Sequence, residues 1–161
     1  MYLKSIYGVD ITKIYGISGL TGLEILSEVG TDMSKWKTAG HYVSWLGLSP
    51  NNKISGGRLL SSSVQKKKNR AGQAFRMAAS TLWNSKNMLG DFYRRKRAIG
   101  GPAGANVATA RKLAIIFYNM VKKQEGFAPI ALEEYQEQYK AKKLKYLEKQ
   151  LKKYGMVAVA T

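Results

Sequence analysis

The segment RAGQAFRMAASTLWNSKN, residues 70–87, decides the fold class of this chain. Its apolar residues recur every three or four positions, at Ala71, Ala74, Phe75, Ala78, Leu82 and, just beyond the segment, Met88. This spacing places them along one face of a helix. Three of the six are alanines, so a second helix can approach this face closely. We therefore expect a core in which helices pack against helices.

Three further segments show the same helical period, over residues 31–48, 106–123 and about 130–154. The first follows the capping candidates Thr31, Asp32 and Ser34, and its apolar side is formed by Tyr42, Val43, Trp45, Leu46 and Leu48. The apolar side of the second is formed by Val107, Ala110, Leu113, Ala114, Phe117, Met120 and Val121. The last carries a stripe of Tyr and Leu side chains, with Gly155 as a candidate C-cap.

Polar and glycine-bearing stretches separate these helices, and convincing strands are few. The sequence therefore predicts an all-α fold in three parts. Residues 1–52 form a helical segment with a helix–hairpin–helix. Residues 53–128 form a basic helical core that contains a Ser-Gly loop, and residues 129–161 form a long amphipathic helix and a tail.

The helical pattern of residues 10–26 is interrupted by Gly16 and Gly19. A helix–hairpin–helix, two short helices joined by a tight turn, has this pattern. In such a motif the N–H groups of the turn and of the following helix N-terminus can hold a phosphate. The alternative is an ordinary turn between helices, in which the glycines serve only to adopt positive φ.

Composition excludes several classes of protein. The 161 residues include no cysteine, which excludes a disulfide framework and a thiolate metal site and suits a reducing cytosol. The sequence contains no run of 18 or more apolar residues, the length that a membrane-spanning helix needs. Its first residues lack the apolar core of a signal peptide. His41, the single histidine, has no neighbouring ligand in the sequence, so we expect a packing or capping role and no metal site.

Residues 53–123 hold nearly all of the charge imbalance. They contain sixteen Lys and Arg residues and one acid, Asp91, whereas residues 1–52 are neutral and residues 124–161 contribute only +2 to the net charge of +17. Such crowding of like charge indicates a polyanionic partner, DNA or RNA. The basic residues alternate with Gly, Ser and Asn, which argues against a basic amphipathic helix lying on a membrane.

The basic residues form groups along the sequence. The first candidate patch for phosphate contains Arg58, Lys66, Lys67, Lys68, Arg70 and Arg76, and the second contains Arg94, Arg95, Lys96 and Arg97. Arg111 and Lys112 are adjacent on a predicted helix and so point in different directions, and we expect at most one to face the phosphates. Phe92 and Tyr93 could stack on bases, although core packing is the more frequent fate of such residues.

Ser55-Gly56-Gly57-Arg58 is the candidate catalytic sequence. A serine hydroxyl attacks poorly unless its proton is removed and the developing charge is stabilised. Glycines let the backbone approach a phosphate, and Arg or Lys stabilises the charge that develops on phosphorus oxygens. The alternative is a plain turn whose hydroxyl bonds a nearby amide. Ser61, Ser62 and Ser63 are competing nucleophiles that lack the adjacent glycines.

The acids are too scattered for metal-assisted phosphoryl transfer, which needs converging carboxylates. Asp91 is the single acid of the basic region. We therefore expect no metal site in this chain, and an activator of Ser55 has to come from another domain or chain.

Several motifs follow one another in a known order. They are Trp45-Leu-Gly-Leu-Ser-Pro50, Ser55-Gly56, a Lys/Asn/Arg cluster leading into Arg76-Met-Ala-Ala79, and then Tyr93, Gly104, Ala110-Arg-Lys-Leu113 and Tyr118. Over roughly residues 10–128 the chain resembles the C-terminal transposase domain of the bridge-RNA-guided insertion-sequence transposases and recombinases. Full-length members of that family also carry an N-terminal RuvC-like domain with four acidic residues.

The resemblance implies a function and a set of partners. By position, Ser55 is the nucleophile that forms a covalent 5′-phosphoserine link to DNA. The RuvC-like domain, absent from this sequence, would hold Mg²⁺ and complete the active site, so we expect this chain alone to be inactive. Guide RNA, a second copy of the full-length protein and a cytoplasmic, nucleoid-associated location follow from the same resemblance.

Two other functions stay open at this stage. The chain could be a non-catalytic helical module that binds DNA or RNA through the helix–hairpin–helix and the basic loops. It could also be a product of a mobile element that binds element ends and represses transposition without any chemistry.

Overall fold

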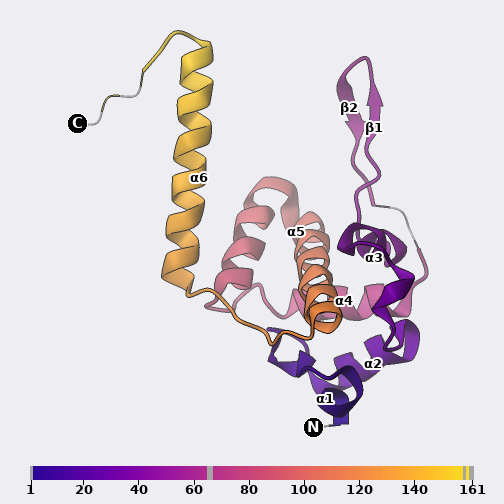
Figure 1. Cartoon of the computed structure of the whole chain (residues 1–161). Helices are drawn as coiled ribbons and strands as arrows, with labels where there is room; N and C mark the ends of the chain where they lie inside the picture. Colours follow the sequence, from indigo (N-terminus) through magenta and orange to yellow (C-terminus); the bar gives the residue numbers. More distant parts are fainter. Residues whose placement is uncertain (1, 65–66, 158, 160–161) are drawn as a thin grey trace.

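The computed structural model describes residues 2–64, 67–157 and 159. In these residues it is mostly helical, with one small antiparallel sheet of two strands (Figure 1). The helices are α1 (Tyr2–Tyr7), α2 (Gly19–Val29), α3 (Ala39–Trp45), α4 (Arg70–Ser80), α5 (Met88–Lys123) and α6 (Leu132–Lys153), the 3-10 turns are η1 (Ile11–Lys13) and η2 (Met33–Lys35), and the strands are β1 (Lys53–Ser55) and β2 (Arg58–Ser61). The predicted helical fold is confirmed, and the sheet is an addition to it.

Helix α4 lies at the centre of the core, where it packs against both α2 and α5. The six apolar residues of the predicted stripe are all buried, as the helical spacing indicated. Gly72 brings α4 so close to the end of α3 that a Cβ there would lie 2.2 Å from the carbonyl oxygen of Leu46. The helix ends at Ser80, earlier than expected, because Thr81 and Leu82 bond the carbonyls three residues back and tighten the last turn.

Helix α5 consists of two arms. The backbone leaves the helical conformation at Gly101, whose φ is 73°, and Pro102 follows at the start of the second arm. Figure 1 shows the chain running out along the first arm, reversing, and returning along the second. The second arm therefore begins before the expected residue 106, because the backbone departs from the helical conformation at Gly101.

An aromatic cluster joins the second arm of α5 to α3 and η2. The Tyr42 ring lies 5.0 Å from Trp36, 5.6 Å from Tyr118 and 6.2 Å from Phe117 between centroids. Phe75 of α4 completes the cluster at 6.4 Å from Tyr42. Aromatic pairs at these separations add to the stability that burial of their area supplies. This cluster fixes the body from which the hairpin of β1 and β2 extends.

Helix α6 projects from the body (Figure 1), and none of its described residues is buried. Contacts near its start hold it to α5, where the Arg95 guanidinium lies 3.6 Å from the ring centroid of Tyr139. The helix ends at Lys153, and Gly155 follows with a φ of 69°, which confirms its predicted role at the C-terminus of the helix.

The first segment differs from the expected helix–hairpin–helix, which is not confirmed. The structure has the single 3-10 turn η1 in place of the first short helix, with Asp10 as its cap. Gly16 follows with a φ of 83°, and Ser18 caps α2. Residues 31–48 likewise divide into two elements in place of one helix, because a polar side chain caps the start of each. Asp32 caps η2, and Thr38 caps the shorter α3.

Candidate functional site

The Ser55-Gly56-Gly57-Arg58 sequence is the tip of a β-hairpin, where a loop was expected. Ser55 ends β1 and pairs with Arg58, which begins β2. Gly56 and Gly57 form the two-residue turn between them, with φ angles of 54° and 75°. A two-residue hairpin turn of the type I′ class needs positive φ at both central positions, and Gly-Gly adopts it without a Cβ penalty. The glycines therefore close a hairpin that presents Ser55 at its end.

Cross-strand pairing places Ser55 and Arg58 on one face of the hairpin. Directly opposed residues of an antiparallel pair have Cβ atoms about 4.5–5.5 Å apart and side chains on the same side. Both residues are exposed. Among the described residues, no hydrogen bond to the Ser55 hydroxyl is present, so the internal bond of a plain turn is absent there. The tip thus places the Ser55 hydroxyl and the Arg58 guanidinium on the same face of the hairpin.

The opposite face of the hairpin is apolar. Ile54 pairs with Leu59, and Leu60 lies at the irregularity in the register before Ser61 pairs with Lys53. Their exposed fractions are 66%, 57% and 68%. Exposed apolar side chains gathered on a projecting ribbon are typical of a contact surface. Sequence reasoning missed this feature because the stretch was expected to be a loop.

The competing serines lie at the base of the hairpin. The Ser61 hydroxyl accepts a hydrogen bond from the backbone N–H of Ser63 at 3.3 Å, and the two hydroxyl oxygens are also 3.3 Å apart. A serine used in a local turn of this kind is engaged in holding the backbone. Hydrogen bonding therefore distinguishes Ser61 and Ser63 from Ser55, and position at the base of the hairpin distinguishes all three competing serines from it.

Some of the predicted phosphate-binding cations hold backbone carbonyls of the body. The Lys67 ammonium donates to the Ser44 carbonyl at 2.9 Å, and Arg76 donates to the Gly47 carbonyl at 2.8 Å. Both acceptors lie at the C-terminal end of α3, where carbonyls lack helical partners and cations are favourable. These two side chains therefore stabilise the end of α3, from which the chain continues into the hairpin.

A second group of cations lies around the first arm of α5. Arg94 donates to the carbonyls of Trp83 and Ser85 at 3.1 and 2.9 Å. Arg95 forms an ion pair with Asp91 at 2.9 Å, and the Arg97 guanidinium lies 5.8 Å from the Trp83 ring centroid.

Lys112 lies 4.4 Å from the ring centroid of Phe92, and its ammonium is 3.3 Å from the Tyr135 hydroxyl. It therefore faces α6, while its neighbour Arg111 lines a groove. The expectation that they point in different directions is met.

The remaining predicted cations and glycines are more exposed or lie elsewhere. Lys66 lies outside the described residues. Arg58, Lys68 and Arg70 are exposed. Gly19 starts α2 with open space around it. Gly16 packs on α4, where a Cβ added to it would lie 2.7 Å from the Ala78 carbonyl oxygen. Phosphate binding by all of these positions stays a prediction.

A groove of about 700 Å³ lies between the base of the hairpin and the two arms of α5. Phe92 and Arg111 are among its lining residues, while the neighbouring Tyr93 is buried. Of the two aromatic residues considered for stacking, Tyr93 is thus in the core. Sequence reasoning did not predict the groove, since it forms between segments distant in the chain.

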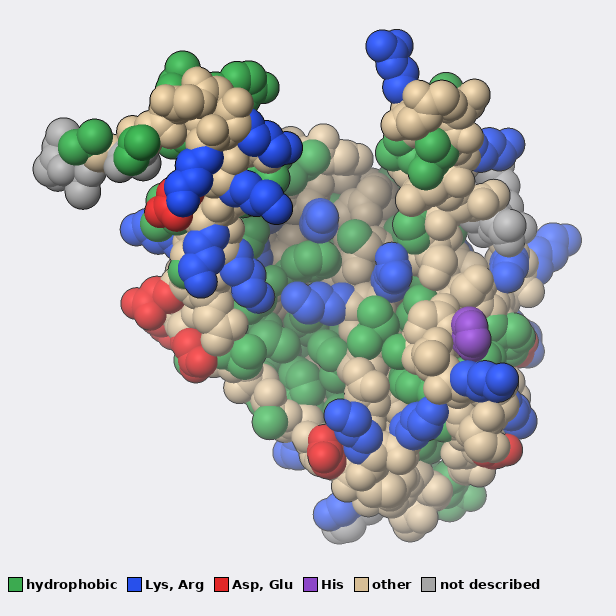
Figure 2. Space-filling view, turned by 45° about the horizontal axis from the view of Figure 1, so that its top comes forward, with side chains coloured by type: hydrophobic (Ala, Val, Ile, Leu, Met, Phe, Trp, Pro, Cys, Tyr) green, Lys and Arg blue, Asp and Glu red, His purple; other side chains and the backbone are tan. Residues whose placement is uncertain are grey.

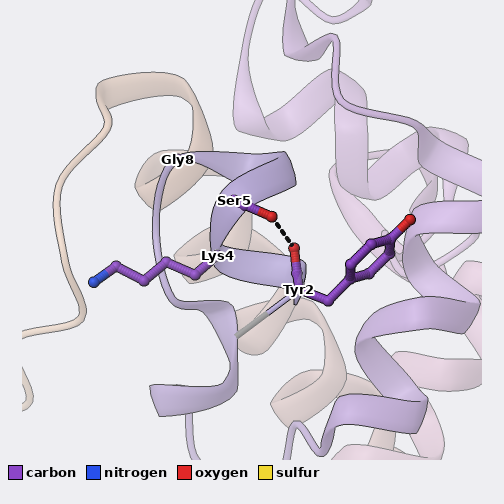
Figure 3. A pocket seen from close by; sticks show the side chains of 4 residues that line it. All are labelled: Tyr2, Lys4, Ser5 and Gly8. Carbon is purple, nitrogen blue, oxygen red and sulfur yellow. Dashed lines mark hydrogen bonds between the residues drawn. The ribbon is translucent and has the colours of Figure 1, made fainter.

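A second hollow on α1 brings no functional groups together. Figure 3 shows its four lining residues, with the Ser5 hydroxyl donating to the Tyr2 carbonyl at 2.7 Å and the Lys4 side chain extending away from Tyr2.

No group of three or more His, Cys, Asp or Glu residues that could hold a metal ion occurs among the described residues. His41 is exposed. In the part of the chain that the structure describes, no helix is both long and apolar enough to cross a membrane.

Figure 2 shows where the charge gathers. Lys and Arg side chains lie on the hairpin, along α6 and on the surface between them, mixed with hydrophobic side chains. The hairpin that carries Ser55 therefore borders a surface with the cations that a polyanion requires.

Comparison with known proteins places this arrangement in a family. No curated protein matches the sequence. The family model described as Transposase IS116/IS110/IS902 family matches residues 10–94, which is more than half of the chain. The match begins at η1, includes the hairpin with Ser55 and the whole of α4, and ends in the first arm of α5. It covers less than the expected residues 10–128 but includes the candidate catalytic sequence. The chain therefore belongs to the Transposase IS116/IS110/IS902 family.

Proposed function

We propose that this chain is the catalytic-serine domain of a transposase or recombinase, and that Ser55 attacks a DNA phosphodiester. Membership of a transposase family carries a role in moving DNA. The observation that supports the serine is its place at the tip of a projecting hairpin, opposite Arg58. A nucleophile on such a ribbon can reach a phosphate that a compact surface would keep at a distance.

The chemistry follows from the two groups at the tip. The Ser55 oxygen forms a bond to phosphorus while the bond from phosphorus to the 3′ oxygen breaks, which leaves a 5′-phosphoserine and a 3′-hydroxyl. The serine gives its proton to a base, and the 3′ oxygen takes up a proton as it leaves. Arg58 stabilises the negative charge on the phosphorus oxygens in the transition state.

The residues described here provide neither the base nor a set of metal ligands. The Mg²⁺ implied by the family resemblance does not fit the carboxylates of the described residues, which do not converge. We propose that a RuvC-like domain of the same or another protomer supplies both. Guide RNA, assembly with further copies and a place with the nucleoid in the cytoplasm belong to the same proposal.

A covalent adduct tests the proposal. This chain is mixed with the matching RuvC-like domain, Mg²⁺, guide RNA and DNA labelled on the 3′ side of the cut, the side that stays bonded to the serine, and the products are separated under denaturing conditions. We expect a protein–DNA adduct with the unaltered chain and none with Ser55→Ala. Because Ser55 is exposed, that variant should fold and bind DNA as before.

Two control variants make the result specific. Ser61→Ala removes the nearest competing hydroxyl, and Ser80→Ala removes one that is distant, on α4. Both should still form the adduct. An adduct that persists in Ser55→Ala and disappears in Ser61→Ala would contradict the assignment. If strand exchange by the full-length protein is unaffected by Ser55→Ala, the non-catalytic binding module is the correct function.

A further inference from the structure

The groove between the hairpin base and α5 has a mixed lining that the serine proposal does not use. One wall consists of the residues just before and after the hairpin, among them Asn52, Ser62 and Val64. The other wall is the pair of α5 arms on either side of Gly101. A β-bridge between Pro50 and Val64 closes the base of the hairpin against this wall. The groove is thus built from two elements that the fold holds in place.

Its charge is positive. Lys96 of the first arm and Arg111 of the second arm line the groove, and its described lining contains no Asp or Glu. Arg111 is half-buried, and its Nε is fully buried without a hydrogen-bond partner among the described residues. A donor N–H removed from water without a hydrogen-bond acceptor is costly, so the Nε of this partly buried guanidinium favours a negatively charged ligand nearby.

Apart from these two cations, the wall formed by α5 is apolar and leaves room. Phe92 and Val107 provide a flat aromatic and aliphatic surface, while Ala103, Gly104 and Ala108 keep the second arm thin. Around Gly104, a Cβ would meet nothing within 4 Å. At about 700 Å³ the groove falls in the range that holds organic ligands of the size of a nucleotide.

We propose that this groove holds one unpaired nucleotide of a nucleic-acid strand. The base lies against Phe92 and the aliphatic surface, and the phosphate next to it meets Arg111 and Lys96. Stacking of a base on an aromatic side chain and a charge-assisted bond to phosphate are the two contacts on which single-strand recognition depends.

The groove lies close to the hairpin tip. Asn52 precedes Ser55 by three residues, a strand length of about 10 Å. If Ser55 is the nucleophile, the nucleotide in the groove lies within a few positions of the attacked phosphate along the strand. This spacing rests on the proposed function, whereas binding of an unpaired nucleotide does not.

Fluorescence of a single-stranded oligonucleotide that carries one 2-aminopurine tests the proposal with the full chain. We expect binding to change the 2-aminopurine emission, and a duplex of the same sequence to produce no such change. Gly104→Leu fills the groove and should abolish the emission change. Since this glycine is exposed, helical and free of close contacts, the variant should fold at least as well as the unaltered chain.

Arg111→Gln is compared with Lys86→Gln, which removes the same charge from an exposed position outside the groove. Arg111→Gln should weaken binding of the single strand about tenfold, as expected for loss of a charge-assisted hydrogen bond. Lys86→Gln should preserve the emission change. Unaltered emission changes in both Gly104→Leu and Arg111→Gln would overturn the proposal.

Oligonucleotides of DNA and of RNA identify the source of the strand. Preference for DNA indicates the cut strand, and preference for RNA indicates a guide, and either result supports an unpaired nucleotide. Equal binding of single strands and duplexes, without effect of Gly104→Leu, contradicts it. Ser55→Ala should bind the single strand normally. If the single strand binds in the groove but no adduct forms with the unaltered chain, only the serine proposal is refuted. If the adduct forms but Gly104→Leu and Arg111→Gln do not alter binding of the single strand, only the groove proposal is refuted.

Discussion

Two tyrosines of the aromatic cluster show how the chemistry of a single hydroxyl depends on its surroundings. Tyr118 donates from its hydroxyl to the Trp36 carbonyl at 2.7 Å, and Lys122 donates to the same hydroxyl. The Tyr42 hydroxyl is buried without a partner among the described residues. Burial, and to a smaller extent the nearby Tyr7, raise the pKa of Tyr42 well above its ordinary value, so this phenol stays neutral in the folded protein.

Removing the two hydroxyls should therefore have different effects on stability. Tyr118→Phe breaks a buried hydrogen bond and leaves the Trp36 carbonyl unpaired, which should lower the free energy of unfolding by about 1–3 kcal/mol. Tyr42→Phe removes an unpaired polar group and should leave the free energy of unfolding unchanged or raise it by about 1 kcal/mol. Urea denaturation of both variants measures the difference.

The pH dependence provides a check on the same pair. Because the folded pKa of Tyr42 is raised, the unfolded chain loses this proton first, and stability falls as the pH rises above the ordinary value of 10.0. Tyr42→Phe should reduce this alkaline loss. A larger loss of stability in Tyr42→Phe than in Tyr118→Phe at neutral pH would contradict the assigned hydrogen bonding.

At this scale the sequence identified residue types but not their partners. The apolar periods correctly predicted that Phe75, Leu113 and Phe117 are buried. Nothing in the sequence indicates that Arg76 bonds the Gly47 carbonyl, since a long cationic side chain can reach either backbone or solvent. Which cations are free for phosphate is decided by the fold.

Among the elements, α4 depends on close approach at Gly72, whereas the start of α2 at Gly19 does not. At Gly72 of α4 an added Cβ would lie 2.2 Å from the backbone oxygen of Leu46, so the α3–α4 contact would have to open. At Gly19, the first residue of α2, an added Cβ would meet nothing. The same substitution therefore tests packing in one helix and only propensity in the other.

Gly72→Ala should lower the free energy of unfolding by about 2 kcal/mol or more, because overpacking against backbone forces a shift. Gly19→Ala should change it by less than about 1 kcal/mol, in the stabilising direction, because alanine favours the helix. Thermal and urea denaturation of the two variants provide the comparison. Equal effects of the two substitutions would contradict the close approach of α3 and α4.

The elements also show where sequence reasoning stopped. The helices were predictable, because apolar periods of three and four residues continue over many turns. The hairpin was not, because Ile54, Leu59 and Leu60 do not alternate with polar residues, and Gly56-Gly57 occurs in loops and in tight turns alike. The groove depends on where the helix reverses at Gly101 relative to the hairpin, which local pattern does not encode.

For the whole molecule, the hairpin and α6 project on the same side of the body (Figure 1), and basic side chains are scattered among hydrophobic ones on the surface between them (Figure 2). The net charge of +17 disfavours the compact state through self-repulsion, and a polyanion on this face would relieve it. Folding and nucleic-acid binding are thereby linked, so binding should also raise the thermal stability of the chain.

The salt dependence of DNA binding separates cations that meet phosphates from cations that support the fold. Each phosphate contact contributes about −0.9 to the slope of log affinity against log salt for duplex DNA. Arg70 is exposed at the start of α4, whereas Arg76, two turns later on the same helix, donates to the Gly47 carbonyl at 2.8 Å. Arg70→Gln should therefore reduce the steepness of the slope by about 1 without lowering stability.

Arg76→Gln should have the opposite pattern. The slope should stay unchanged, while loss of the hydrogen bond to Gly47 should lower the free energy of unfolding by about 1–3 kcal/mol, as for a bond from a charged donor. Titrations of labelled duplex at several salt concentrations, combined with urea denaturation, measure both quantities for each variant. If Arg76→Gln reduces the slope as much as Arg70→Gln does, Arg76 contacts a phosphate as well as the Gly47 carbonyl. The face that binds DNA would then extend to the end of α3.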